Sequence, residues 1–164
     1  MSDRVSSIVR WSALAAMCVL IFVFSSFAAT DSSQQSSRWV DIIISLFFNG
    51  FDEYPAANQE ALVSLLTVIV RKGAHFSEYA LLSMLAFSAF RRVKRHSLRW
   101  LFAVLFSFVY SCSDEFHQTF VPGRAGLFRD VILDTSGAAF GALAACFISL
   151  MFLARKLLAS ADDL

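Results

Sequence analysis

Long apolar stretches divide the chain and predict membrane-spanning helices. Residues 11–29 are apolar or small throughout, and a helix needs about 20 such residues to cross a bilayer. Residues 72–90, 98–115 and 130–154 form three further stretches of this kind. A signal peptide is the alternative for the first stretch, but its apolar run exceeds the usual core of about 7–15 residues. The pattern therefore predicts an all-α membrane protein, a single domain over residues 1–164 with a bundle of four transmembrane helices.

The region between the first two predicted spans is more polar. Residues 30–38 are rich in Ser and Gln and predict a loop. Residues 40–48 are apolar but too short to span, which predicts a short interfacial helix in the first outer loop, with Trp39 as its anchor. Residues 49–58 again predict a loop. Residues 61–70 are expected to form the outer part of the helix that continues as the second span.

The composition also favours a membrane protein. The chain is 57% hydrophobic and only 16% charged, whereas a soluble domain is about half apolar and a quarter charged. A net charge of +1 and the absence of a basic, aromatic-interleaved stripe predict no nucleic-acid partner. Tyr79 and Tyr110 are expected to be interface anchors. Cys18, Cys112 and Cys146 lie in apolar runs without metal spacing, so we expect buried thiols rather than disulfides.

The distribution of charge predicts the orientation. Basic residues gather near the N-terminus, between residues 91 and 99, and at Arg155 and Lys156, whereas residues 31–60 hold five acidic residues and one basic residue. The positive-inside rule then predicts a multi-pass protein of the cell membrane with both termini cytoplasmic. The start of the second span, the end of the third and the start of the fourth would all lie at the outer face.

Polar side chains concentrate at these three places. Residues 114–118 place two carboxylates, an imidazole and an amide at the end of the third span, before a Pro-Gly turn that ends the helix. Side chains three or four positions apart share one face of a helix, which groups His75 with Glu78. Charged groups within spans are usually functional. The candidate ligand-binding residues are Lys72, His75, Glu78, Asp114, Glu115, His117, Gln118, Arg124, Asp130 and Asp134.

One stripe on the fourth span combines carboxylates with small residues. Asp130, Asp134 and the GxxxG motif of residues 137–141 follow one another at spacings of four, three and four. Because GxxxG motifs allow close helix packing, this face is expected to look inward. Asp134 lies one turn deeper than Asp130 and should have a partner, with Arg124 and Lys72 as candidates.

These segments resemble the VanZ-like membrane protein family. The resemblance rests on Arg71-Lys72-Gly-Ala-His75-Phe-Ser-Glu78-Tyr79, on residues 114–124, and on the stripe that begins at Asp130. Phe24-Ser25-Ser26 is similar to the polar exit of the family's first helix. The resemblance implies a small bacterial multi-helix membrane protein, and the founding member is associated with low-level resistance to teicoplanin. Asp134 departs from the pattern, because asparagine is more usual there.

Three kinds of chemistry fit the candidate residues. They could form a purely structural network, or a zinc site from His75, Glu78, His117 and one carboxylate of residues 114–115. Because no recognised zinc spacing supports the second reading, no metal and no cofactor are predicted. Lys72 and Arg124 instead suit a phosphate or lipid headgroup.

The leading hypothesis is an envelope protein that binds a lipid headgroup or lipid-anchored ligand at the outer leaflet and affects susceptibility to teicoplanin. Its predicted partner is membrane lipid, with a lipid-linked cell-wall intermediate or a glycopeptide as a further candidate. The alternative is a membrane enzyme that hydrolyses or transfers a phosphate-linked group on a lipid or cell-wall precursor. Its candidate catalytic residues are His75, Glu115 and His117.

Overall fold

A computed structural model describes residues 3–27 and 29–162 as a set of helices, without a strand in these two ranges. The elements in order are α1 (Asp3–Ser25), α2 (Ala29–Phe47), the short 3-10 helix η1 (Phe51–Glu53), α3 (Ala56–Ala89), α4 (His96–Gln118) and α5 (Phe128–Asp162). This confirms the predicted all-α class.

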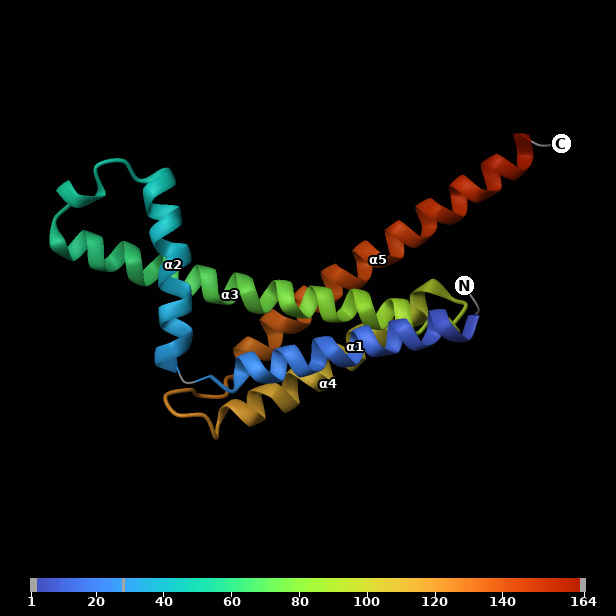
Figure 1. Cartoon of the computed structure of the whole chain (residues 1–164), viewed down its shortest axis with the longest axis horizontal. Coiled ribbons are helices and arrows are strands. Elements are labelled where there is room, and N and C mark those ends of the chain that lie inside the picture. The colour runs from blue at the N-terminus through green and yellow to red at the C-terminus, as the bar shows by residue number, and fades with distance from the viewer. Residues whose placement is uncertain (1–2, 28, 163–164) are drawn as a thin grey trace.

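The four long helices α1, α3, α4 and α5 lie lengthwise, and each runs opposite to the one before it (Figure 1). The two ends of the chain lie at the same end of the molecule, while α2 stands across the outer part of α3 at the other end (Figure 1). Helix α3 is central, because it contacts each of the other α-helices.

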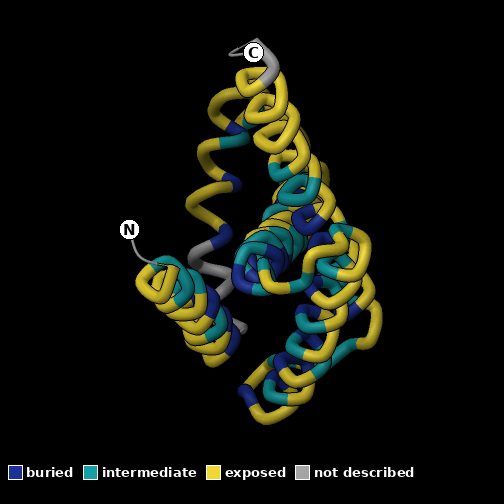
Figure 2. The backbone as a smooth tube through the Cα atoms, turned by 90° about the vertical axis from the view of Figure 1, so that its right-hand side faces the viewer, coloured by how far each residue is buried: buried dark blue, intermediate teal, exposed yellow. Residues whose placement is uncertain are grey.

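Small and aliphatic side chains hold the bundle together. Helix α1 buries Leu14, Met17 and Ile21, which lie three and four positions apart on one face. They belong to one core with Leu82 of α3 and Ala142 of α5. Figure 2 shows the same division, with buried positions on the inner side of α1 and exposed positions on its outer side.

The GxxxG motif of α5 faces inward, as predicted, and lets α5 cross close to α3. Gly137 lies against the backbone of Phe76 and Gly141 against the backbone of Ala80, so a Cβ atom at either glycine would overlap a carbonyl group of α3. Small residues of this kind let two helix backbones approach one another. The crossing brings the start of α5 directly beside the middle of α3.

Two helices of the described part of the chain, α1 and α5 over Phe128–Ser160, are long and apolar enough to cross a membrane. The structure therefore does not confirm the predicted bundle of four spans. The physical reason is visible in α4, because its buried face is polar and carries Ser107, Ser111 and Asp114. Such a helix has low hydropathy even where it is enclosed by other helices.

The prediction for the first outer loop was partly wrong. Residues 30–38 are helical and belong to α2, so the short helix expected over 40–48 is only its second half. Val40 and Ile44 of α2 pack on Leu66 of α3. Tertiary packing of this kind stabilises helices whose local sequence does not favour them.

Candidate functional site

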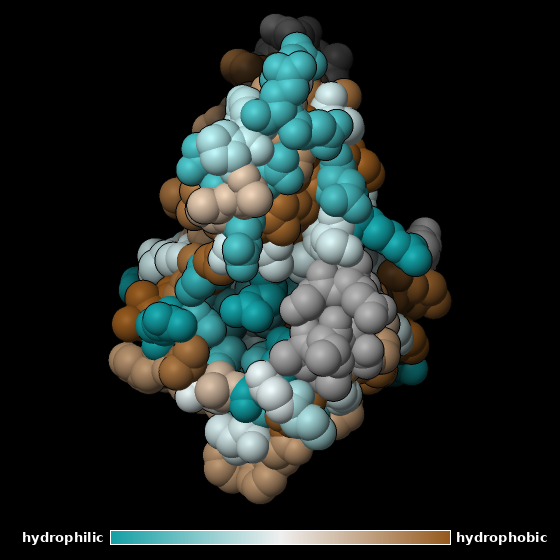
Figure 3. Space-filling model, turned by 90° about the vertical axis from the view of Figure 1, so that its left-hand side faces the viewer, coloured by the Kyte–Doolittle hydropathy of each residue, from teal (hydrophilic) through white to brown (hydrophobic). Residues whose placement is uncertain are grey.

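The polar side chains gather at one end of the bundle, where the end of α1, the middle of α3, the end of α4 and the start of α5 meet. The structure brings all the candidate residues to this region through direct contacts or shared cavities. Figure 3 views the molecule from this end and shows a hollow with hydrophilic walls. Their role in binding a ligand stays a prediction.

Asp114 joins α4 to α1. Its Oδ2 accepts a hydrogen bond of 2.9 Å from Ser25 Oγ and one of 3.3 Å from Gln118 Nε2. All three side chains are buried. Because a buried carboxylate needs hydrogen-bond donors, Ser25 stabilises the position of α1 against α4. Sequence reasoning did not place Ser25 among the candidate residues, although it lies in the polar exit of the first helix.

Replacing Ser25 by alanine is expected to lower the free energy of unfolding by about 1–3 kcal/mol, since a buried acceptor loses its closest donor. Ser26→Ala is the matched control, because Ser26 is exposed and water can replace the hydrogen bond between its hydroxyl and His117. Chemical unfolding in detergent, followed by circular dichroism, measures both. Equal effects of the two substitutions would contradict the importance of the buried bond.

His117 faces α1. Its Nε2 lies 3.2 Å from Ser26 Oγ, and its ring stacks on Phe22 with centroids 4.5 Å apart. It does not line either of the cavities at this end. Its position is therefore more typical of a side chain that holds two helices together than of one that contacts a ligand.

The loop between α4 and α5 folds back over the end of α4. Gly123 adopts the left-handed conformation, with φ of 74°. Arg124 then donates from Nε to the Phe27 carbonyl at 3.2 Å and from Nη1 to Gln118 Oε1 at 3.4 Å. Burial, followed by the neighbouring positive charge of Arg71, lowers the pKa of Arg124, whereas three nearby carboxylates raise it.

Glu115 supports the same loop, because its Oε2 accepts a hydrogen bond of 2.8 Å from the Leu127 amide. Gly126 lies so close to the Glu115 carbonyl that a Cβ atom would overlap it. The carboxylate of Glu115 therefore positions the start of α5 by holding the residues just before it.

Two carboxylates of α5 pair with α3. Lys72 Nζ lies 3.0 Å from Asp130 Oδ1 in a partly exposed ion pair. One turn deeper, Asp134 is fully buried and accepts a hydrogen bond of 2.8 Å from Ser111 Oγ, while its Oδ1 lies 3.9 Å from His75 Nδ1. Arg124 and Lys72 were the predicted partners of Asp134, and this prediction was wrong. Lys72 forms its ion pair with Asp130 instead, and Ser111 of α4 donates the hydrogen bond to Asp134.

Four buried polar atoms within the described residues have no hydrogen-bond partner: His75 Nδ1, Tyr79 Oη, Ser83 Oγ and Asp134 Oδ1. His75, Tyr79 and Ser83 lie four positions apart on one face of α3. Tyr79 has no exposed surface, so its predicted role as an interface anchor was wrong. Unpartnered buried polar groups are rare and costly, and here they extend the polar site into the bundle.

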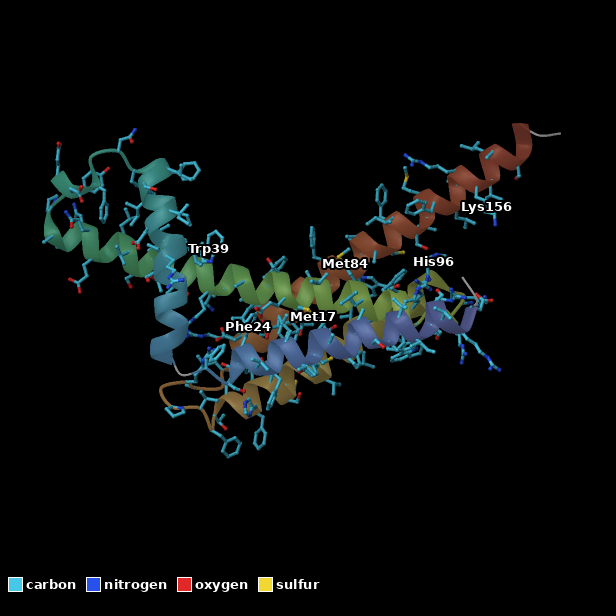
Figure 4. All side chains as sticks on the ribbon, viewed as in Figure 1. Met17, Phe24, Trp39, Met84, His96 and Lys156 are labelled. Atoms are coloured by element: carbon cyan, nitrogen blue, oxygen red, sulfur yellow. The ribbon has the colours of Figure 1, made fainter. Side chains whose placement is uncertain are left out.

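Two neighbouring cavities of about 260 and 200 Å³ open at this end. Arg71, His75 and Arg124 line both of them. Phe24 of α1 and Trp39 of α2, both labelled in Figure 4, contribute apolar surface to the larger cavity. The cavities therefore combine cationic, titratable and apolar groups within one region.

Arg71 was not among the candidate residues, although a signal for it was present. Arg71, His75 and Glu78 are spaced by four and three positions, which places them on one face of α3. All three line the larger cavity. Helical periodicity applied to the cationic residues of this segment would have selected Arg71 as well as Lys72.

Within residues 3–27 and 29–162, no three His, Cys, Asp or Glu side chains come together in a way that could hold a metal ion. The zinc set weighed from the sequence required His75 and His117 at one point. Because His117 contacts α1 instead, that set does not assemble.

The fold and the site together define a helical membrane protein with a polar site at one end of its bundle. The chain matches the VanZ/LLP1 family over residues 11–151 and belongs to that family, which confirms the resemblance found in the sequence. Searches among curated proteins and among solved structures found no significant match.

Proposed function

We propose that this VanZ/LLP1 protein binds an anionic lipid headgroup or lipid-anchored ligand in the cavities lined by Arg71, His75 and Arg124. The observation that carries the proposal is that two cations on different elements, α3 and the α4–α5 loop, line the same two cavities. Guanidinium groups match phosphate and carboxylate oxygens in geometry as well as charge.

The balance of charge supports an anionic ligand. Among the residues that line the two cavities, Arg71, Lys72 and Arg124 are cationic, whereas Glu78 and Asp130 are anionic. Asp130 is already paired with Lys72. Two guanidinium groups, Arg71 and Arg124, then face one lining carboxylate, Glu78, so the cavity walls carry a net positive charge.

The apolar part of the larger cavity favours a lipid over a small free anion. Phe24 and Trp39 are both exposed and line the cavity beside Arg71. Tryptophan is enriched where apolar surface meets polar groups at a membrane interface. A headgroup could bind the cations while the glycerol or acyl region contacts these rings.

We further propose that all four long helices cross the cell membrane, with both termini cytoplasmic and the polar site at the outer leaflet. The alternating directions of these helices support an even number of crossings (Figure 1). The turn that joins α3 to α4, at the end of the bundle where both termini lie, is rich in Arg and Lys, as cytoplasmic segments are. On this topology the ligand could be an outer-leaflet phospholipid or a lipid-linked cell-wall intermediate.

Trp39 provides a reporter for the test. In a variant whose other tryptophans are replaced by phenylalanine, phosphatidylglycerol with brominated chains should quench Trp39 at lower lipid fractions than brominated phosphatidylcholine. Arg71→Gln is expected to weaken this preference about tenfold, as the loss of one charge-assisted hydrogen bond implies. Arg129→Gln is the matched control, because Arg129 belongs to the same end of the bundle but lines neither cavity.

The same variants test the proposed effect on teicoplanin. Cells that produce Arg71→Gln at normal levels should lose any change in teicoplanin susceptibility that the unaltered protein confers, whereas cells with Arg129→Gln should keep it. Unchanged quenching together with unchanged susceptibility in Arg71→Gln would show that Arg71 has no part in ligand binding.

The unpartnered His75 Nδ1 favours a second candidate function, in which His75 acts as an acid or base on a bound phosphate-linked lipid. Turnover of such a lipid by the purified protein should then fall at least about 100-fold in His75→Ala. His117→Ala should retain it, since His117 contacts α1 rather than the cavities. Absence of turnover in the unaltered protein would remove this alternative.

A further inference from the structure

A third cavity lies at the opposite end of the bundle, between the start of α1 and the turn that joins α3 to α4. Its volume is about 610 Å³. The N-terminal end of α1 lies close to this turn in Figure 1. Its lining is strongly cationic, with Arg4, Arg91, Arg92 and Lys94 facing a single carboxylate, Asp3. We call this cavity the basic cleft.

The one carboxylate of the basic cleft is already neutralised. Arg91 Nη2 lies 2.6 Å from Asp3 Oδ1, and Arg91 Nη1 donates to Ser6 Oγ at 3.4 Å. This pair fastens the start of α1 to the turn that follows α3.

Three cations therefore remain without a balancing acid. Within the part of the chain that the structure describes, Arg4, Arg92 and Lys94 form no ion pair, and all three are exposed. They come from two segments that are far apart in sequence but line one cleft. Clustered cations of this kind attract anionic headgroups at a membrane surface.

The basic cleft continues into an apolar groove on the outer face of α4. The groove has a volume of about 400 Å³ and is lined by Phe90, Val93, Phe102, Leu105, Phe106 and Val109. Phe90 and Val93 line both the cleft and the groove. Trp11 packs edge-to-face on Phe90, with ring centroids 5.6 Å apart, and forms an aromatic wall at the junction.

We propose that the basic cleft and the apolar groove together bind one anionic phospholipid. The phosphate binds Arg92, Lys94 and Arg4, and one acyl chain passes Phe90 and lies along α4. A soluble phosphate compound would use only the cationic half, whereas a neutral lipid would use only the apolar half. The continuity of the two halves through Phe90 and Val93 fits a ligand that carries both, and this site is separate from the one proposed for the headgroup-binding function.

Trp11 lines the basic cleft and reports on this site independently of Trp39. With Trp11 as the remaining tryptophan, brominated phosphatidylglycerol should quench it at about tenfold lower lipid fraction than brominated phosphatidylcholine. The triple variant Arg4→Gln, Arg92→Gln, Lys94→Gln should lose this preference. The control Arg95→Gln, Arg155→Gln, Lys156→Gln removes the same charge from residues that do not line the cleft, and it should keep the preference.

Competition distinguishes a phospholipid from a free anion. Inorganic phosphate and short-chain dihexanoyl phosphatidylglycerol should each fail to displace the brominated long-chain lipid at equal concentration, because neither fills the groove along α4. Displacement by inorganic phosphate alone, equal losses in the two triple variants, or no preference for the anionic lipid would each overturn the proposal. None of these outcomes depends on quenching at Trp39, so the proposals for the two sites are tested independently.

Discussion

Gly141→Ala is expected to lower the free energy of unfolding by at least about 2 kcal/mol, because the added methyl group overpacks the crossing of α3 and α5. A Cβ atom at this position would lie 2.6 Å from the Ala80 carbonyl carbon and 2.7 Å from its Cα. Both atoms belong to the helix backbone, so neither can rotate away as a flexible side chain could. The two helices would have to separate.

Gly73→Ala is the matched control, since it makes the same chemical change in the interior of α3 where nothing lies within 4 Å of the new Cβ. Alanine is favoured over glycine in a helix by about 1 kcal/mol, so this variant should be slightly more stable than the unaltered protein. Unfolding in mixed detergent micelles, followed by circular dichroism, measures the two changes. Stabilisation by both substitutions would show that the α3–α5 crossing is looser than described.

The same crossing links stability to the site. Gly137 of α5 lies against Phe76 of α3, the residue next to His75. Asp134, one helical turn before Gly137, lies 3.9 Å from His75. Separation of the two helices would therefore move the buried carboxylate away from the imidazole. We expect Gly141→Ala to weaken ligand binding at the cavities even though Gly141 does not line them.

Helical periodicity accounts for the part of the site that the sequence predicted. His75 with Glu78, and Asp114 with Gln118, were grouped because side chains three or four positions apart share a helix face. The positive-inside rule then suggested that the three polar segments share one end of the bundle, and the structure brings them together there. These inferences need only local spacing and the alternation of helix direction.

The pairing within the site could not be predicted in the same way. Ser111 rather than Lys72 donates to Asp134, and Ser25 reaches Asp114 across 89 positions of sequence. Serine is common in the sequence and gives no signal of its own. Which serine faces a carboxylate depends on helix rotation and on close crossings such as that at Gly137, and these are set by packing in three dimensions.

The extent of α2 was predicted wrongly and the number of spans was not confirmed, for a related reason. The polar composition of residues 30–38 predicted a loop. The structure shows that these residues are the first half of α2, whose second half packs on α3 through Val40 and Ile44. Conversely, α4 was predicted to span, yet its buried face is polar, and within the described residues only α1 and α5 meet the criterion of length and apolarity. In both helices the outcome depends on which side chains are buried against other helices, and composition alone does not give this.

The double variant Arg71→Gln, Arg124→Gln is expected to weaken phosphatidylglycerol binding at the Trp39 reporter about 100-fold. Each guanidinium is expected to contribute about tenfold, and the two losses multiply because each cation binds a different oxygen of the anion. Both residues line both cavities from different elements, so a bound anion would lie between them. The measurement is the lipid fraction at half-maximal quenching, compared with the single variants.

Arg124 also holds the α4–α5 loop through Phe27 and Gln118, so charge and loop support must be separated. Arg71→Lys, Arg124→Lys keeps both charges but loses the planar guanidinium geometry, and it should bind within about tenfold of the unaltered protein. If the double glutamine variant instead binds as well as Arg71→Gln alone, Arg124 acts as a clamp on the loop and not as a ligand to the headgroup. In that case Arg71 would be the principal cation of the site, because the charge of Lys72 is already balanced by its ion pair with Asp130.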